Sequence, residues 1–175
     1  MADVPDGIVL KYHRDLDGMR KTLWPRRIII GAVGAFALLG LLNVFGQRPV
    51  NASADTAQAS LKLNAPDHLR GGLLFSARFH IAAHQDVKDA VLVLDQGWAE
   101  GMAINTIEPS PLGQASRDGK ISLDLGHIPA GQSYVLYMQF QSNATTVAWR
   151  RSAGVTLYDG PKRLLHIDRK VTVYP

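Results

Sequence analysis

Two histidines and a nearby carboxylate have the residue types of a metal site. His80 and His84 are four residues apart, and Asp86 follows closely. On a helix this spacing places both imidazoles on one face, where they can bind zinc. The surrounding residues alternate between apolar and polar, however, which predicts a strand, and strand residues four apart are separated by about 13 Å. A metal-dependent hydrolase at His80, His84 and Asp86 is therefore the less favoured alternative, and we expect no cofactor.

Signatures of other catalytic sites are missing from the sequence. No serine stands in a nucleophile-elbow motif, and Asp95, Glu100 and Glu108 are spread over a loop-rich stretch. The chain contains no cysteine, which excludes disulfide bonds, thiolate metal sites and a cysteine nucleophile. We therefore predict that the protein is not an enzyme.

Two tryptophans and a pair of arginines are the candidate contact residues. Trp98 lies in the same loop-rich stretch, where a tryptophan either forms a binding edge or packs over the end of a domain. Trp149 is followed directly by Arg150 and Arg151. An indole beside guanidinium groups is typical of protein interfaces, although edge strands also carry such residues to block strand pairing. The sequence thus predicts an interface at Trp98, Trp149, Arg150 and Arg151.

An apolar segment near the N-terminus is predicted to be a transmembrane helix, which we assign to residues 28–46. Residues 28–45 include no charged side chain and one polar side chain, Asn43. A helix of this length is about 27 Å long, which matches the hydrocarbon core of a bilayer. A buried helix of a globular domain would keep one polar face, and this segment has none. The lipid bilayer is therefore an expected partner.

Basic residues flank the apolar segment unevenly. Those that precede it are Lys11, Arg14, Arg20, Lys21, Arg26 and Arg27. Only Arg48 follows closely, so the positive-inside rule predicts a cytoplasmic N-terminus and a periplasmic or extracellular C-terminal domain, with the span in the cytoplasmic or inner membrane. A cleaved signal peptide is the alternative, because Ala52-Ser53-Ala54 has the form of a cleavage site. The long basic region before the span favours an uncleaved signal anchor.

Residues 1–27 are expected to form a cytoplasmic tail with a short amphipathic helix. The apolar residues of this tail recur every three or four positions, at Ile8, Tyr12, Leu16, Met19 and Leu23. Such a helix would lie in the headgroup layer until Pro25 turns the chain into the membrane. A partly disordered tail is the alternative.

The rest of the sequence predicts a linker and one mainly-β domain. Residues 47–59 are rich in small and polar side chains without periodicity, which is typical of a linker. Residues 60–175 contain short apolar or alternating runs separated by turn residues. The runs are 60–64, 73–82, 90–94, 103–107, 121–125, 133–141, 146–158 and 164–173. Seven to nine such strands predict an immunoglobulin-like antiparallel β-sandwich, with a closed barrel as the alternative.

One turn sequence resembles a motif of a known family. Residues 125–133 read LGHIPAGQS and lead into an alternating run. They are similar to the L-G-x-[LI]-x-A-G-x-[ST] turn of bacterial immunoglobulin-like surface and accessory modules (CARDB-like β-sandwiches). The resemblance covers about residues 60–174, since residues 79–94 also look like the early strands of those modules. It implies a turn between two core strands and a role in adhesion, spacing or partner docking, without catalytic residues.

Together these observations predict a membrane-anchored, non-catalytic interaction or accessory protein. Its tail, span and external domain could all contact another integral membrane protein, which is the expected class of partner. The formal charge of +4 is not gathered in a dense basic stripe, so nucleic acid is not an expected partner. A carbohydrate-binding module of the cell envelope, using Trp98 or Trp149, is the alternative from another class.

Overall fold

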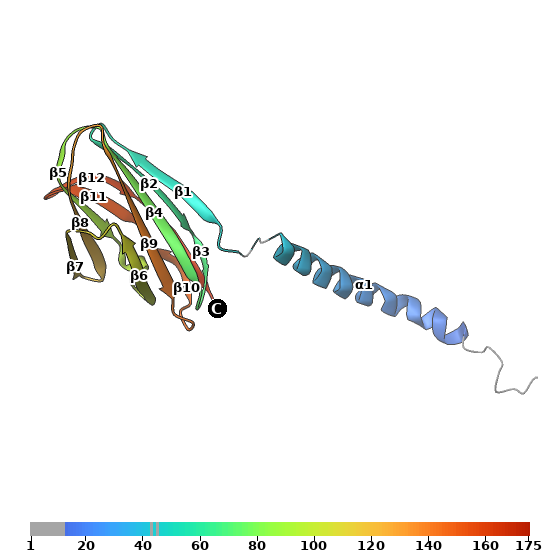
Figure 1. The fold of residues 1–175 in the computed structure, drawn as a ribbon. Helices are drawn as coiled ribbons and strands as arrows, with labels where there is room; N and C mark the ends of the chain where they lie inside the picture. The colour runs from blue at the N-terminus through green and yellow to red at the C-terminus, as the bar shows by residue number, and fades with distance from the viewer. Residues whose placement is uncertain (1–12, 43, 45) are drawn as a thin grey trace, which may run out of the picture. The chain divides into compact units, whose positions relative to one another are not determined.

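The computed structural model describes residues 13–42, 44 and 46–175. The chain divides into two compact units, Met1–Phe45 and Gly46–Pro175. The described residues of the first unit contain a helix, and the second unit contains the strands (Figure 1).

The helix of the first unit is α1 (His13–Leu41). α1 includes Pro25 within one continuous helix, and the expected turn of the chain into the membrane at this residue stays a prediction. A proline inside a helix removes a single main-chain hydrogen bond, and the turns on either side keep the backbone helical. Ile8 and Tyr12 of the predicted amphipathic stripe lie outside the described residues.

The apolar part of α1 is Leu23–Leu41. These 19 residues are long and apolar enough to cross a membrane, and they are not buried against the rest of the chain. A signal sequence near the N-terminus has the same length and composition. The prediction of one apolar helix ahead of the β domain is therefore confirmed, and this helix suits either a membrane anchor or a signal sequence.

The second unit consists almost entirely of short strands. They are β1 (Pro49–Asp55), β2 (Ala59–Pro66), β3 (His68–Arg70), β4 (Leu74–Ala83), β5 (Val87–Leu94), β6 (Met102–Glu108), β7 (Gly113–Arg117), β8 (Lys120–Ile128), β9 (Ser133–Ser142), β10 (Ala148–Ser152), β11 (Val155–Asp159), β12 (Lys162–Ile167) and β13 (Lys170–Tyr174). A 3-10 turn, η2 (Gln96–Trp98), follows β5.

The described strands form two larger sheets and one smaller sheet. The larger sheets have the orders β1-β2-β4-β9-β6 and β12-β11-β5-β8-β7, and the smaller sheet has the order β10-β13-β3. Neighbouring strands are antiparallel except for β13 and β3, which are parallel. The two larger sheets are layers of one sandwich (Figure 1). The predicted antiparallel β-sandwich is confirmed.

The core lies between the layers and is built from alternate strand residues. In β4 the buried side chains include Phe79 and Ile81, and in β9 they include Leu136 and Phe140. The opposite layer contributes Leu92 of β5 and similar residues of β8 and β11. In β4 and β9 this period of two buries one face of the strand and leaves the other face partly or fully exposed.

Strand β1 replaces most of the predicted linker at residues 47–59. It pairs with β2 along its whole length, from Pro49 opposite Pro66 to Asp55 opposite Ser60. Its inward residues, Ala52 and Ala54, are too small to produce a hydrophobic alternation in the sequence, although they pack against the core. The linker prediction is therefore wrong for this segment, and the connection between α1 and β1 is residues 42–48.

Turns separate the strands that follow the predicted runs, whereas two long runs are divided. Asp118 and Gly119, between β7 and β8, both have positive φ angles (52° and 72°), as a tight hairpin turn requires. Residues 125–133 contain the turn from β8 to β9, which carries the chain from one large sheet to the other. The predicted runs 146–158 and 164–173 each break into two strands that belong to different sheets.

Candidate interaction surface

Trp98 is a core residue, so its prediction as an interface residue is wrong. Only 2% of it is exposed. The indole packs between Phe79 and Phe140, with ring centroids 5.6 and 5.2 Å away, and its Nε1 donates a hydrogen bond to the Ala153 carbonyl at 2.8 Å. The residues around Trp98 have the composition of an exposed loop. The segment that covers this loop is 55 residues further along the chain, so the local sequence does not show that Trp98 is buried.

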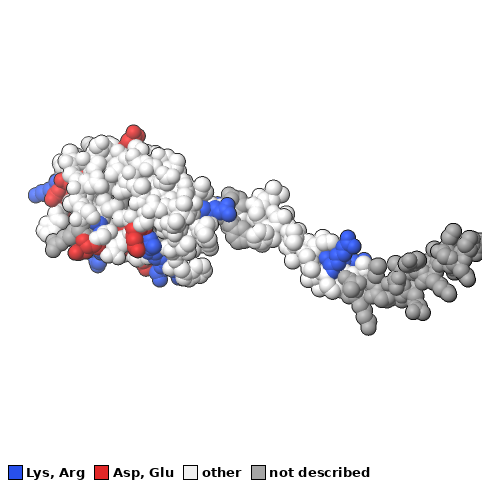
Figure 2. All heavy atoms as spheres, turned by 90° about the horizontal axis from the view of Figure 1, so that it is seen from below, with Lys and Arg blue, Asp and Glu red and all other residues white. Residues whose placement is uncertain are grey.

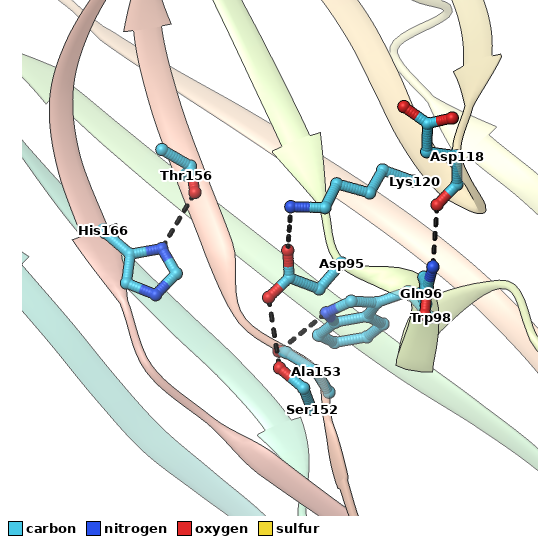
Figure 3. A network of polar contacts seen from close by, with 9 residues as sticks. All are labelled: Asp95, Gln96, Trp98, Asp118, Lys120, Ser152, Ala153, Thr156 and His166. Carbon is cyan, nitrogen blue, oxygen red and sulfur yellow. Dashed lines mark hydrogen bonds and ion pairs between the residues drawn. The ribbon is translucent and has the colours of Figure 1, made fainter.

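Polar contacts connect the segments around Trp98, which are η2, the β7–β8 hairpin and residues 152–154 (Figure 3). We call this region the corner. The Asp95 carboxylate pairs with Lys120 Nζ at 3.3 Å and accepts a hydrogen bond from Ser152 Oγ at 3.2 Å. Gln96 Nε2 donates to the Asp118 carbonyl at 2.8 Å. These contacts join η2 to the β7–β8 hairpin and to the link between β10 and β11. The carboxylate of Asp95 is thus engaged in holding the fold.

A half-buried arginine, Arg169 of the β12–β13 connection, packs against the same corner. The Arg169 guanidinium lies 5.2 Å from the Trp98 ring centroid and donates hydrogen bonds to the carbonyls of Ala65 and Pro66. Burial lowers the pKa of Arg169 to about 10, and the nearby Asp67 carboxylate opposes this shift. The side chain therefore remains charged at neutral pH, with carbonyl oxygens and an aromatic face in place of water.

The predicted metal ligands are directed to different partners. His84 Nε2 lies 3.0 Å from Asp55 Oδ1, whereas Asp86 Oδ1 lies 2.7 Å from His127 Nε2. His80 faces outward from β4, opposite Lys62 of β2. Within the described residues, no group of three or more His, Asp or Glu side chains is placed to hold a metal ion.

Trp149 is the most prominent of the predicted contact residues, with 77% of its surface exposed. It lies in β10, at the edge of the small sheet, where the pairing with β13 is interrupted between Ala148 and Arg151. The bulge contains Trp149 and Arg150, and Arg150 has a φ of 49°. Non-glycine residues rarely adopt this left-handed conformation, so the backbone here is strained in a way that presents the two side chains.

Arg151 differs from Arg150 in that its side chain has partners within the domain. Its Nη1 donates to the Glu100 carbonyl at 2.6 Å, and its Nε lies 3.6 Å from the Glu100 carboxylate. This pair connects β10 to the loop after η2. The predicted contact set is therefore divided: Trp149 and Arg150 are presented to solvent, while Arg151 and Trp98 hold the domain together.

Further exposed apolar side chains lie at the same end of the sandwich as Trp149. The loops before β4 and after β9 are joined there, because Gly72 N donates to the Ser142 carbonyl at 3.0 Å. These loops and the adjoining strand ends contain Leu73, Leu74 and Val147, all exposed. Pro49, where the chain arrives from residues 42–48, pairs with Pro66 at this end. We call it the tether end and define it by Pro49, residues 66–74 and residues 142–150.

The tether end was only partly visible in the sequence. Leu73, Leu74 and Phe75 are three consecutive apolar residues that lead into an alternating run, and a strand with one buried face leaves alternate residues exposed. Nothing local indicates that Val147 and Leu73 belong to one end of the domain, because that depends on the pairing of β4 with β9. Elsewhere the charged side chains are mixed in sign over the face that Figure 2 shows.

Replacing Arg150 by Gly is expected to keep or raise the free energy of unfolding, by up to about 1 kcal/mol, because glycine adopts a positive φ without strain. Urea unfolding of the full-length protein in detergent, followed by circular dichroism, measures this. Arg151→Gly is the matched control and should lose about 1–2 kcal/mol with its Glu100 contacts. Equal losses in both variants would show that the Arg150 side chain stabilises the domain, which contradicts a side chain that is only exposed to solvent.

Comparison with known proteins shows the fold and no closer relationship. No protein family matches the chain, and no curated protein matches its sequence. A crystal structure of Salmonella alpha-2-macroglobulin reacted with methylamine is similar with a TM-score of 0.51 and 14% identity, over 74% of this chain and 10% of that one. AvmM, described as catalysing macrocyclization in alchivemycin A biosynthesis, has a TM-score of 0.38 and 8% identity, over 74% and 92% of the two chains.

A non-cellulosomal cohesin from the hyperthermophilic archaeon Archaeoglobus fulgidus has a TM-score of 0.34 and 15% identity, over 61% of this chain and 78% of that one. The chain thus spans about a tenth of the length of the macroglobulin that it resembles. The likeness to the macroglobulin concerns the fold alone, and it agrees with an immunoglobulin-like β-sandwich.

Proposed function

We propose that this protein is a non-catalytic interaction protein, anchored in a membrane by Leu23–Leu41 and docking to an integral membrane protein through the tether end of its sandwich. The N-terminus lies in the cytoplasm, because Arg26 and Arg27 directly precede the most apolar residues. The sandwich then lies in the periplasm or outside the cell. The resemblance of residues 125–133 to bacterial CARDB-like accessory modules supports the same role.

The exposure of Trp149 is the observation that carries this proposal. Tryptophan and arginine are the residues that most often dominate the binding energy of protein interfaces. Here an exposed indole and an arginine share a strained bulge, with Leu73, Leu74 and Val147 at the same end. Large apolar side chains exposed together at one end of a domain favour an interaction site there.

The short connection to α1 favours a partner that is itself in the membrane. Residues 42–48 span at most about 24 Å when fully extended. The tether end, where this connection joins β1, is therefore within reach of the headgroup layer of the bilayer that holds α1. A protein that contacts Trp149 there would have an extramembrane surface close to the bilayer, as integral membrane proteins do.

Trp149→Ala is expected to reduce recovery of the membrane partner about tenfold or more, since a central tryptophan contributes about 2 kcal/mol or more to binding. The experiment is a pull-down of the full-length protein in mild detergent, with the amounts of co-purified proteins measured by mass spectrometry. A photo-crosslinking residue at position 147 identifies which of those proteins touches the tether end. Leu112→Ala is the control, because Leu112 is 78% exposed and lies outside this end.

The outcome against this docking surface is a partner retained equally by wild-type protein, Trp149→Ala and Leu112→Ala. Equal losses in both variants would indicate a general loss of surface hydrophobicity. If position 147 crosslinks to no protein although a partner co-purifies, contact through the tail or the span replaces contact through the sandwich.

A carbohydrate of the cell envelope is the second candidate ligand, favoured by the exposed indole of Trp149. The flat apolar face of an indole can stack on a sugar ring, while its N–H is available to a hydroxyl. Trp98 has no such role, because it is buried. Retention of the full-length protein on isolated cell-wall polysaccharide, lost in Trp149→Ala without any crosslinked protein, would favour this candidate.

A further inference from the structure

We propose that the outer face of the sheet β1-β2-β4-β9-β6 holds a binding site for a phosphate group, carried by a lipid headgroup or by a soluble phosphate compound. The site is formed by Lys62, Arg78 and His80, with Asn51 and Asn64 at its edge. It is distinct from the tether end and is independent of the docking proposed there.

Strand register brings the basic residues together. Lys62 of β2 lies directly opposite His80 of β4, and Asn64 lies opposite Arg78, two residues along each strand. Neighbouring strands are about 4.8 Å apart, and alternate residues of a strand about 6.8 Å apart. Three of the four positions of this small square are therefore basic, and all four side chains project from the same face of the sheet.

The outer face around these residues is fixed by contacts of its own. Asn64 Nδ2 donates to Asn51 Oδ1 at 2.6 Å, which leaves the Asn51 amide hydrogens available as donors. The Arg78 guanidinium lies over the Tyr137 ring, 5.2 Å from its centroid. One row across four strands thus contains Asn51, Asn64, Arg78 and Tyr137. In this row the Tyr137 ring and the two asparagine amides restrict the Arg78 guanidinium, which lies between them.

Among the described residues no carboxylate forms an ion pair with Lys62 or Arg78. Lys62, Arg78 and His80 take part in none of the ion pairs of the described chain. On the same face, Asp55 is held by His84, and Glu108 lies beyond Tyr137 on β6. Lys62 and Arg78 are diagonal neighbours of like charge on this face, and such neighbours repel each other, so an anion that binds between them balances their charges.

The shape and the donor content of the surface both suit a phosphate. A shallow hollow of about 400 Å³ is lined by Asn51, Lys62, Leu63, Asn64, Arg78 and His80, of which Leu63 alone is apolar. Nζ, guanidinium, imidazole and amide N–H groups are all hydrogen-bond donors, and Asn64 Oδ1 is the one amide oxygen left to accept. A doubly charged oxyanion with several acceptor oxygens matches this set, whereas a neutral ligand leaves the cations unbalanced.

The test is a titration of the full-length protein, in neutral detergent, with inorganic phosphate against sodium chloride of the same ionic strength. Phosphate should raise the unfolding temperature of the wild-type protein above the value in chloride, because a ligand of the native state stabilises it. The double variant Lys62→Gln/Arg78→Gln should bind phosphate about tenfold more weakly or worse, since it lacks two charge-assisted contacts. Lys88→Gln/Arg163→Gln removes the same charge from two other exposed residues and should bind as the wild type does.

Two results would overturn the site. One is an unfolding temperature that phosphate and chloride change equally in the wild-type protein. The other is an equal loss of phosphate binding in both double variants, which would mean a response to net charge. Because Lys62 and Arg78 are exposed, folding of the variant is checked by its circular dichroism spectrum before the titration.

Further arms of the same experiment distinguish the source of the phosphate. The full-length protein is reconstituted in phosphatidylcholine liposomes and mixed with fluorescent vesicles of phosphatidylcholine containing phosphatidylglycerol. Capture of these vesicles by the wild type, with loss in Lys62→Gln/Arg78→Gln, assigns the site to a lipid headgroup. Phosphate binding without vesicle capture assigns it to a soluble phosphate compound.

Discussion

Replacing Trp98 by Ala is expected to lower the free energy of unfolding of the sandwich by about 3–5 kcal/mol, the cost of deleting a large buried aromatic side chain. Three interactions would be lost together. The aromatic contacts with Phe79 and Phe140 would disappear, the Ala153 carbonyl would lose its donor, and the Arg169 cation would lose the ring beneath it. Such a loss is a large share of the stability of an ordinary domain.

Urea unfolding of the full-length protein in detergent, followed by circular dichroism in the strand region, measures this change. Trp149→Ala is the matched control, because it deletes the same side chain from an exposed position and should change the free energy of unfolding by no more than about 0.5 kcal/mol. A loss of about 1 kcal/mol or less in Trp98→Ala would contradict a core position for Trp98. Similar losses in both variants would contradict the exposure of Trp149.

Trp98 also shows why sequence alone misjudges such residues. The stretch around it is rich in polar and small residues, which is typical of a surface loop. Its partners are Phe79, Phe140, Ala153 and Arg169, all distant in sequence. A local pattern cannot show that these segments pack together, so an exposed loop and a buried loop have the same local sequence pattern.

The strands that sequence could predict are those with a strong apolar signal, either alternating or continuous. β4 and β9 alternate between large apolar and polar residues, and β5 is a continuous apolar run, so each was predicted close to its observed position. β1, β3 and β7 are short or carry mainly small and polar residues, and their position follows from pairing with a neighbour. The long runs 146–158 and 164–173 hide breaks where the chain passes from one sheet to another.

The two candidate surfaces also differ in how far the sequence predicts them. Trp149 and Arg150 were predicted as contact residues from their types alone, and the structure presents both of them to solvent. The square of Lys62, Asn64, Arg78 and His80 was beyond sequence reasoning, because it exists only in one register of β2 against β4. A slip of β2 by one residue would turn Lys62 toward the core and separate it from Arg78.

Gly97→Ala is expected to destabilise the sandwich by about 3 kcal/mol or more, although it adds a single methyl group. Gly97 is buried in η2, and a Cβ there would overlap the Ser152 carbonyl oxygen and lie 2.9 Å from its carbon and 3.3 Å from Ala153 Cα. These atoms belong to the backbone, which cannot move aside as a side chain can. They are also fixed nearby, since Asp95 N donates to Gly154 O and Trp98 Nε1 donates to Ala153 O.

Gly113→Ala tests whether this cost arises from the close approach of two backbones rather than from the loss of a glycine. Gly113 starts β7, and the nearest atom to a Cβ there is Asp124 Cβ at 3.5 Å, an ordinary contact. Its effect should stay within about 1 kcal/mol in the same urea unfolding measurement, and can be favourable because alanine has the less flexible unfolded backbone. If both variants lose equally, the clash at Ser152 does not explain Gly97. A large loss confined to Gly97→Ala shows that the backbone of residues 152–154 packs directly on Gly97. The same backbone covers Trp98. Trp149, a few residues earlier in this segment, is then the indole that is available to a partner.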